Sequence, residues 1–233
     1  MSAFPPLSKQ EVVALLDSVP VFHIVNEDGR IVGTSDENGE EAVRWWADVD
    51  EANSALVVAQ LKSPEMPLRL SVTPLGTAFA LSEKWQETPS KLPLKLHASR
   101  AVVAGVADEL GATADADAFP IFSCEELSNS RIMPFFLSRQ DLLDTWVAAG
   151  RPAEAVPKEL TVTLLRTLAK LMLERPLESA GSSTTGAGTA MNWRTSMFIA
   201  SSKATKKAHE LQEADNAIRQ KKEEKDAEPP PLE

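Results

Sequence analysis

The sequence predicts an α+β protein in which two pseudo-twofold-related repeats share a mixed sheet flanked by helices. The apolar segments VPVF at 19–22 and FPIF at 119–122 carry the same proline. The segments LSVT at 70–73 and LTVT at 160–163 also match, at a spacing of ninety residues. Matches at two similar long spacings indicate two copies of one structural unit, with loops that absorb the difference.

Each element of the first copy follows from a local pattern. The segment SKQEVVALLDS predicts a capped helix, and a strand rich in β-formers follows at 19–25. The turn dipeptides DG and NG then predict a hairpin and a further strand that ends in Trp45 and Trp46. A capped amphipathic helix at 48–61, a strand at 68–72, a helix at 75–85 and a strand at 92–96 complete the copy.

The second copy repeats this order. An aromatic pair at 135–136 matches Trp45 and Trp46, and matched helix caps begin at Asp48 and Ser138. The insertion ELGATADADA precedes the second FPIF strand, whereas the first copy has the longer hairpin. Because either copy alone would expose an apolar face, we expect the two copies to share a core.

Composition divides the chain into three parts. We expect one lobe over 1–97, a second lobe over 98–200 and a charged tail over 201–233. Glycine, serine and threonine at 178–192 predict a flexible surface loop within the second lobe. Beyond 201 there is little apolar stripe except Leu211 and Ile218, so we expect an exposed helix that ends in disorder. Such a tail is either solvated or a charged docking peptide.

The charge balance narrows the class of partners. With 34 acidic and 24 basic residues the net charge is -10, and the averaged field repels phosphate backbones. We therefore expect no nucleic-acid partner. No run approaches the roughly twenty apolar residues of a membrane span, so we expect no direct span. The single cysteine, Cys124, is typical of a small buried thiol.

No pattern predicts an enzyme or a cofactor site. The histidines His23, His97 and His209 lie in separate elements without metal-ligand spacing, so no metal is expected. The phosphate-loop, dinucleotide and nucleophile-elbow motifs do not occur. We expect no catalytic residues, no cofactor and no enzymatic activity. A hydrolase with a cleft between the lobes is the minor alternative, although no nucleophile and base can be paired.

Aromatic residues give the strongest signal for a binding surface. They occupy matched places in the two copies, at strand ends where neighbouring side chains point to opposite faces. One member of each pair should enter the core, and its neighbour should lie under a helix or face a groove. The alternatives are core packing and a concave apolar surface that holds extended clients. The candidate client-binding residues are Phe22, Trp45, Trp46, Phe122, Phe135 and Phe136.

Several segments together resemble a known family. VPVFHIVNEDGRIV, RWWADVDEANSAL, FPIFSCEEL and MPFFLSRQDLLDTW occur in the order and spacing of the Tic-twenty-two (Tic22) family. The likeness runs from about residue 8 to about residue 200 and includes LPLKLHASRAVV and NWRTSMFIAS. That family is the small soluble component of the chloroplast protein-import translocon in the envelope intermembrane space, with periplasmic relatives in cyanobacteria.

The resemblance implies a two-lobed protein with apolar pockets that is a non-enzymatic, chaperone-like component of plastid protein import. The implied partners are unfolded or extended preproteins and other translocon subunits. The implied location is the chloroplast envelope intermembrane space or a peripheral plastid membrane. Relative to the family, we expect this sequence to lack the long targeting extension, and we assign no family counterpart to the charged tail after 201. The alternative is a structural or scaffold subunit of a larger plastid membrane-associated complex, docked through the charged C-terminal helix.

Overall fold

The computed structural model describes residues 5–36, 38–88, 90–111, 118–157, 160–174 and 192–227. The first half, up to residue 97, contains α1 (Lys9–Leu16), β1 (Pro20–Asn26), β2 (Thr34–Ser35), β3 (Glu41–Trp46), α2 (Val49–Lys62), β4 (Leu68–Pro74), α3 (Leu75–Ser82) and β5 (Leu94–His97). The second half, 98–200, contains α4 (Arg100–Gly105), α5 (Ala107–Leu110), β6 (Pro120–Ser123), β7 (Met133–Phe136), α6 (Arg139–Ala148), β8 (Thr161–Leu164), α7 (Leu165–Glu174) and β9 (Ser196–Ile199). The helix α8 (Ser202–Ala227) follows. These elements confirm the α+β class.

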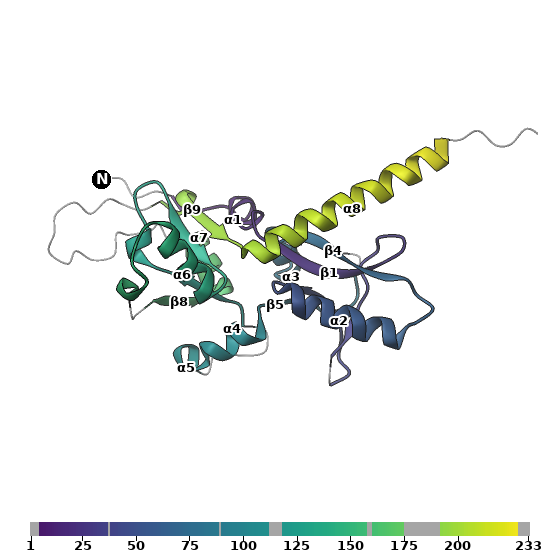
Figure 1. The fold of residues 1–233 in the computed structure, drawn as a ribbon, viewed down its shortest axis with the longest axis horizontal. Coiled ribbons are helices and arrows are strands. Elements are labelled where there is room, and N and C mark those ends of the chain that lie inside the picture. The colour runs from purple at the N-terminus through teal and green to yellow at the C-terminus, as the bar shows by residue number, and fades with distance from the viewer. Residues whose placement is uncertain are drawn as a thin grey trace, which may run out of the picture.

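The halves lie side by side, and α8 starts at the second half, crosses the first and then extends away from the body (Figure 1). The loop expected at 178–192 lies, except for Asn192, outside the described residues, as does the end expected to be disordered beyond 227. The division into domains at 97 and 200 stays a prediction.

Side-chain caps fix where several helices begin. Ser8 and Glu11 form a reciprocal capping box at α1, with the Ser8 amide donating to the Glu11 carboxylate at 2.8 Å. The Asp48 carboxylate accepts from the first free amides of α2, and the Ser138 hydroxyl accepts from the Asp141 amide of α6. Each cap satisfies amides that have no partner within the helix, which is why these polar residues precede apolar helices.

The strands form two sheets, so the expectation of one shared mixed sheet is wrong. The first sheet has the order β2-β3-β1-β4, with β5 beside β3, and the second has the order β8-β6-β7-β9. Each sheet has one apolar face that packs into a core common to both halves. Packing of these faces removes them from water, so no strand pairing between the halves is needed.

The two sheets use the same pairing scheme. In the first, β1 pairs antiparallel with β3 and β4, and β3 pairs parallel with β5. In the second, β6 pairs antiparallel with β7 and β8, and β7 pairs parallel with β9. Phe22 lies opposite Trp46, just as Phe122 lies opposite Phe136. The pseudo-twofold relation between the halves nevertheless stays a prediction.

The core consists of one central cluster and two outer clusters. The central cluster combines residues of both sheets with residues of α1, α3 and α7, so the halves share a core as expected. An N-terminal outer cluster lies between the first sheet and α2, and a C-terminal outer cluster includes Leu142 and Trp146 of α6. Alternation along β1 sends Val21 to the central cluster and Phe22 to the N-terminal outer cluster.

The helix after each half's last strand covers the other half. Ala204 and Ala208 of α8 are buried in the N-terminal outer cluster, and Leu211 packs against it. In the same way, Val106 of the α4–α5 segment is buried in the C-terminal outer cluster, where Val102 also packs. The expectation of a fully exposed C-terminal helix is therefore wrong for its first turns. Small alanine side chains carry this contact, and they do not stand out as an apolar stripe.

Candidate functional site: a pocket between the two halves

All six candidate aromatic residues are buried, with exposed fractions of 7% or less. Trp45 and Phe135 belong to the central cluster. Trp46 packs in the N-terminal outer cluster, and Phe136 packs in the C-terminal one. Each pair thus has one ring in the shared core and one ring in an outer cluster. A client-binding role for the six rings stays a prediction, and in this conformation none of them presents a surface to a client.

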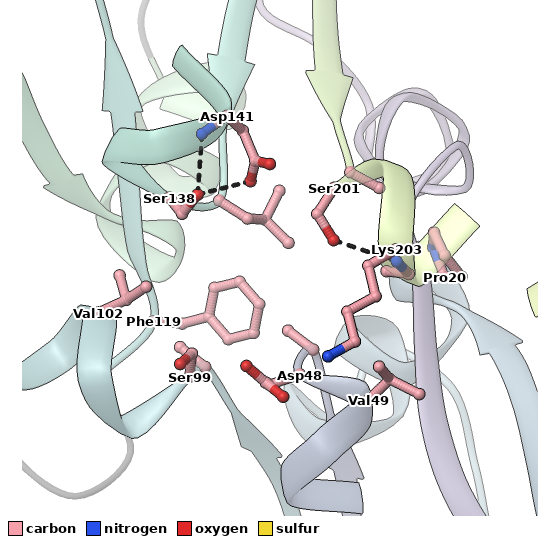
Figure 2. Close-up of a pocket in the computed structure, with 15 residues that line it drawn as sticks. Pro20, Asp48, Val49, Ser99, Val102, Phe119, Ser138, Asp141, Ser201 and Lys203 are labelled. Atoms are coloured by element: carbon pink, nitrogen blue, oxygen red, sulfur yellow. Dashed lines mark hydrogen bonds between the residues drawn. The ribbon is translucent and has the colours of Figure 1, made fainter. Parts of the chain in front are cut away.

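A pocket lies instead at the junction of the two halves, with a cavity of about 130 Å³. Its walls are mostly apolar, and Figure 2 shows Phe119 and Val102 on one side and Pro20, Ser201 and Lys203 on the other. We call this cavity the seam pocket. Its lining residues are Pro20, Ala47, Asp48, Val49, Ala98, Ser99, Val102, Phe119, Leu137, Ser138, Asp141, Ala200, Ser201, Lys203 and Ala204.

The polar rim of the seam pocket consists largely of residues that precede helices. Asp48 and Ser138 cap α2 and α6, Ser99 precedes α4, and the Ser201 hydroxyl accepts from the Ala204 amide of α8 at 3.1 Å. The starts of four helices therefore meet around one apolar cavity. Side chains already accept hydrogen bonds from the first amides of α2, α6 and α8. These helix starts therefore hold the walls of the seam pocket in place.

Charged side chains at and near the rim of the seam pocket also have partners within the protein. The Lys203 ammonium pairs with Asp50 of α2. The Ser138 hydroxyl donates to the Asp141 carboxylate at 2.6 Å, and burial raises the pKa of Asp141 above its ordinary value. The Glu51 carboxylate accepts from the Arg100 amide at 2.7 Å and so ties α2 to the start of α4. The apolar walls are thus the part of the pocket left for a ligand to contact.

A second cavity of about 250 Å³ lies between β5, α3 and the β8–α7 segment. Phe119 lines this cavity as well as the seam pocket. Arg166 of α7 and Glu83 both line the second cavity and form an ion pair at 2.5 Å. Phe119 is therefore the one residue that borders both of these cavities between the halves.

A buried polar group lies under α8 in the first half. Burial lowers the pKa of His23 to about 4, and the Thr73 hydroxyl lies 3.3 Å from its Nδ1 atom. His23 pairs in register with Ser71, whose hydroxyl donates to the Asp215 carboxylate at 3.1 Å. Asp215 also pairs with Arg69. These residues join α8 to the edge strand β4.

The remaining sequence candidates lie apart from the pocket. His97 stacks against Trp46, and His209 faces Glu213 on α8. The described residues hold no group of three or more acidic, histidine or cysteine side chains that could bind a metal ion. The Cys124 thiol is buried, and burial together with Glu126 raises its pKa. Among the described helices, none is both long and apolar enough to cross a bilayer.

Comparisons with known proteins agree with this architecture. The model of the Tic22-like family matches residues 2–208. The structure is similar to Anabaena Tic22, a protein-transport protein, with 17% identity, a TM-score of 0.59 and coverage of 88% of this chain and 98% of that one. It is also similar to Tic22 from Plasmodium falciparum, with 18% identity, a TM-score of 0.59 and coverage of 87% and 98%. No curated protein sequence matches. Because the family model spans most of its length, this chain belongs to the Tic22-like family.

Proposed function

We propose that this protein is a non-enzymatic, chaperone-like component of plastid protein import that binds unfolded or extended preproteins in transit. Membership of the Tic22-like family supports a role in protein transport. The relative from Anabaena is a protein-transport protein and shares the fold. The chloroplast envelope intermembrane space, or the surface of a plastid membrane, is the proposed location.

The seam pocket is the observation that carries this proposal. Its cavity of about 130 Å³ is close to the roughly 150 Å³ that holds a benzene molecule in an engineered apolar cavity. One leucine-sized or phenylalanine-sized side chain of an extended polypeptide therefore fits. The pocket is partly open to solvent, and none of the six candidate aromatic rings lines it. We therefore place the client contact at the apolar lining of this pocket, which includes Phe119, itself 6% exposed and part of the central cluster.

A pocket-filling variant tests the proposal without opening a cavity in the core. Ala200→Leu places three extra carbons at the pocket wall, where they compete with a client side chain. The affinity for an unfolded client, measured by fluorescence anisotropy, should fall about tenfold or more, since burial of one such side chain contributes about 1.5–3 kcal/mol. The matched control is Ala148→Leu on the exposed end of α6, which should bind as the parent does. Equal affinities for both variants would remove the seam pocket from the binding site.

Aggregation of an unfolded client provides the functional readout. The parent protein should slow aggregation at stoichiometric ratios, and Ala200→Leu should slow it less. Trp46→Ala and Phe136→Ala are poor tests of binding, because emptying a buried aromatic site costs about 3–5 kcal/mol and threatens the fold. A parent that leaves aggregation unchanged would contradict the chaperone role.

A scaffold role through α8 is the second candidate function. The family match ends at residue 208, yet α8 continues to Ala227 and extends away from the body (Figure 1). A chain that ends after Asp215 keeps the packed turns and removes only the projecting part. If this truncation loses one defined subunit of a plastid membrane complex while client binding persists, α8 is a docking arm. Retention of every subunit would contradict the scaffold role.

A further inference from the structure

We propose that α8 is a strap that holds one wall of the seam pocket in place, and that release of its Asp215 clamp opens the pocket. This inference rests on the proposed function only for the identity of the ligand that enters the opened pocket. The strap itself follows from the position of α8, from the contacts that hold it, and from where those contacts lie along the helix.

The first turn of α8 is part of the pocket wall. Ser201, Lys203 and Ala204 line the cavity. Figure 2 shows Ser201 and Lys203 opposite Ser99 and Val102. The chain enters α8 directly from β9 of the second half, and the helix then runs over the first half. A change in the direction of α8 therefore moves this wall relative to the rest of the pocket.

The contacts near the pocket hold α8 weakly. Ala204 and Ala208 bury little apolar surface each, and only Leu211 adds a larger side chain. The Lys203–Asp50 pair is 63% and 67% exposed, so water screens it strongly. These contacts leave the direction of the helix dependent on what holds it further along.

The clamp lies at Asp215, where the carboxylate pairs with Arg69 and accepts from the Ser71 hydroxyl. The Asp215 and Arg69 side chains are only 22% and 32% exposed. Asp215 is about 18 Å along the helix from Lys203, at a rise of 1.5 Å per residue. A helix is stiff over this length, so fixing Asp215 on β4 fixes the angle at which the first turn meets the pocket.

The opposite wall has a different support. The Arg100 amide at the start of α4 donates to Glu51, and Glu109 of α5 pairs with Arg139 of α6 at 2.7 Å. The α4–α5 segment therefore has attachments at both ends. The family match ends at residue 208, so Asp215 lies outside the matched region. Control of the pocket through this clamp is thus a property that we assign to this chain and not to its family.

Thiol labelling of the full-length chain measures the opening. Ala98 lines the pocket and is 7% exposed, so Ala98→Cys in a Cys124→Ser background should react slowly with a maleimide reagent. Asp215→Asn should raise the rate about fivefold, which corresponds to about 1 kcal/mol for a partly exposed pair. Arg69→Gln breaks the same clamp from β4 and should give a similar increase.

Two controls separate opening from general loss of structure. Glu210→Gln removes the same charge from the same helix. Among the described contacts Glu210 pairs only with Lys207 of α8, at 3.2 Å. The labelling rate of Ala98→Cys should therefore not change. In the chain without Ala98→Cys, the native Cys124 lies in the C-terminal outer cluster and should remain equally slow with and without Asp215→Asn. Equal rates for Asp215→Asn and Glu210→Gln, or faster labelling of Cys124 with Asp215→Asn, would overturn the strap.

Client affinity distinguishes the strap from the proposed function. If both hold, Asp215→Asn binds the unfolded client with an affinity that differs from the parent, and Ala200→Leu weakens binding in both backgrounds. Faster labelling without any client binding by parent or variant would keep the strap and contradict the proposed function. Client binding that depends on Ala200, with no effect of Asp215→Asn on labelling, would keep the proposed function and contradict the strap.

Discussion

His23 should make the stability of this protein fall in mildly acidic solution. Burial lowers its pKa from 6.5 to about 4 in the folded state, with Arg69 acting in the same direction and Asp215 against it. Between pH 6.5 and about pH 4 the unfolded chain therefore binds a proton that the folded chain does not. The contribution of His23 is complete above pH 6.5 and is lost as the pH falls toward about 4.

The size of the effect follows from the two pKa values. Each unit of pKa difference corresponds to about 1.4 kcal/mol, so the contribution of His23 to the free energy of unfolding should fall by about 3 kcal/mol across this range. The assay is urea unfolding at a series of pH values from 7.5 to about 4 at constant ionic strength.

His23→Gln isolates this contribution, because it removes the titrating group and keeps a side chain that can hydrogen-bond to Thr73. The difference in unfolding free energy between parent and variant should shrink as the pH falls. His209→Gln is the matched control, since the His209 side chain is 72% exposed. An unchanged difference between parent and His23→Gln at every pH would refute the reasoning.

Two further substitutions and one labelling measurement test the packing. Gly76→Ala should cost about 3 kcal/mol by urea unfolding, because the added methyl group would overlap backbone atoms of Val13, whereas Gly105→Ala meets no atom within 4 Å and should be neutral or slightly stabilising. Arg44→Leu should cost about 2–4 kcal/mol in the same assay, since the buried guanidinium donates to the Glu40 carbonyl at 2.9 Å and pairs with Asp36; no loss would show that the hairpin does not depend on this side chain. Cys124 should react with thiol reagents far more slowly than a free cysteine, and rapid reaction of the folded chain would contradict its burial.

Local patterns were sufficient to predict most of the elements. The apolar strands, the DG and NG turns and the caps at Asp48 and Ser138 depend on residues close together in the sequence. These features could be predicted because period-two alternation and capping are decided locally. The cross-strand partners were not predicted: Phe22 lies opposite Trp46 and Phe122 lies opposite Phe136 only once the strands have paired.

The arrangement of the halves could not be predicted in the same way. The two copies can join their sheets edge to edge into one sheet, or they can keep two sheets and pack the apolar faces into a common core. The sequence does not distinguish these two outcomes. The contact of α8 was missed because two of the residues that make it, Ala204 and Ala208, have small side chains, although Ala204, Ala208 and Leu211 follow a helical spacing of four and three. That spacing was the available signal. The Asp215 clamp depends on Arg69, which is far away in the sequence.

The candidate site in the sequence differs from the pocket in the structure for a related reason. Aromatic residues at matched strand ends indicate either core packing or a binding surface. All six rings are buried in the structure, and their role in client binding stays a prediction. The residues that line the seam pocket are mostly alanines, serines and aspartates, which carry no distinctive chemistry in a sequence. The available sequence signal was Phe119, because it is the first residue of the repeated segment FPIF. In the structure Phe119 lines both cavities.

Photocrosslinking from position 119 tests the central claim most directly. A photoreactive phenylalanine analogue replaces Phe119 in the full chain, and a second protein carries the analogue in place of the exposed Val147 on α6. With an unfolded client present, position 119 should form crosslinks that excess unlabelled client removes, and position 147 should not. Crosslinks from position 147 alone, or from neither position while client binding is intact, would contradict the account.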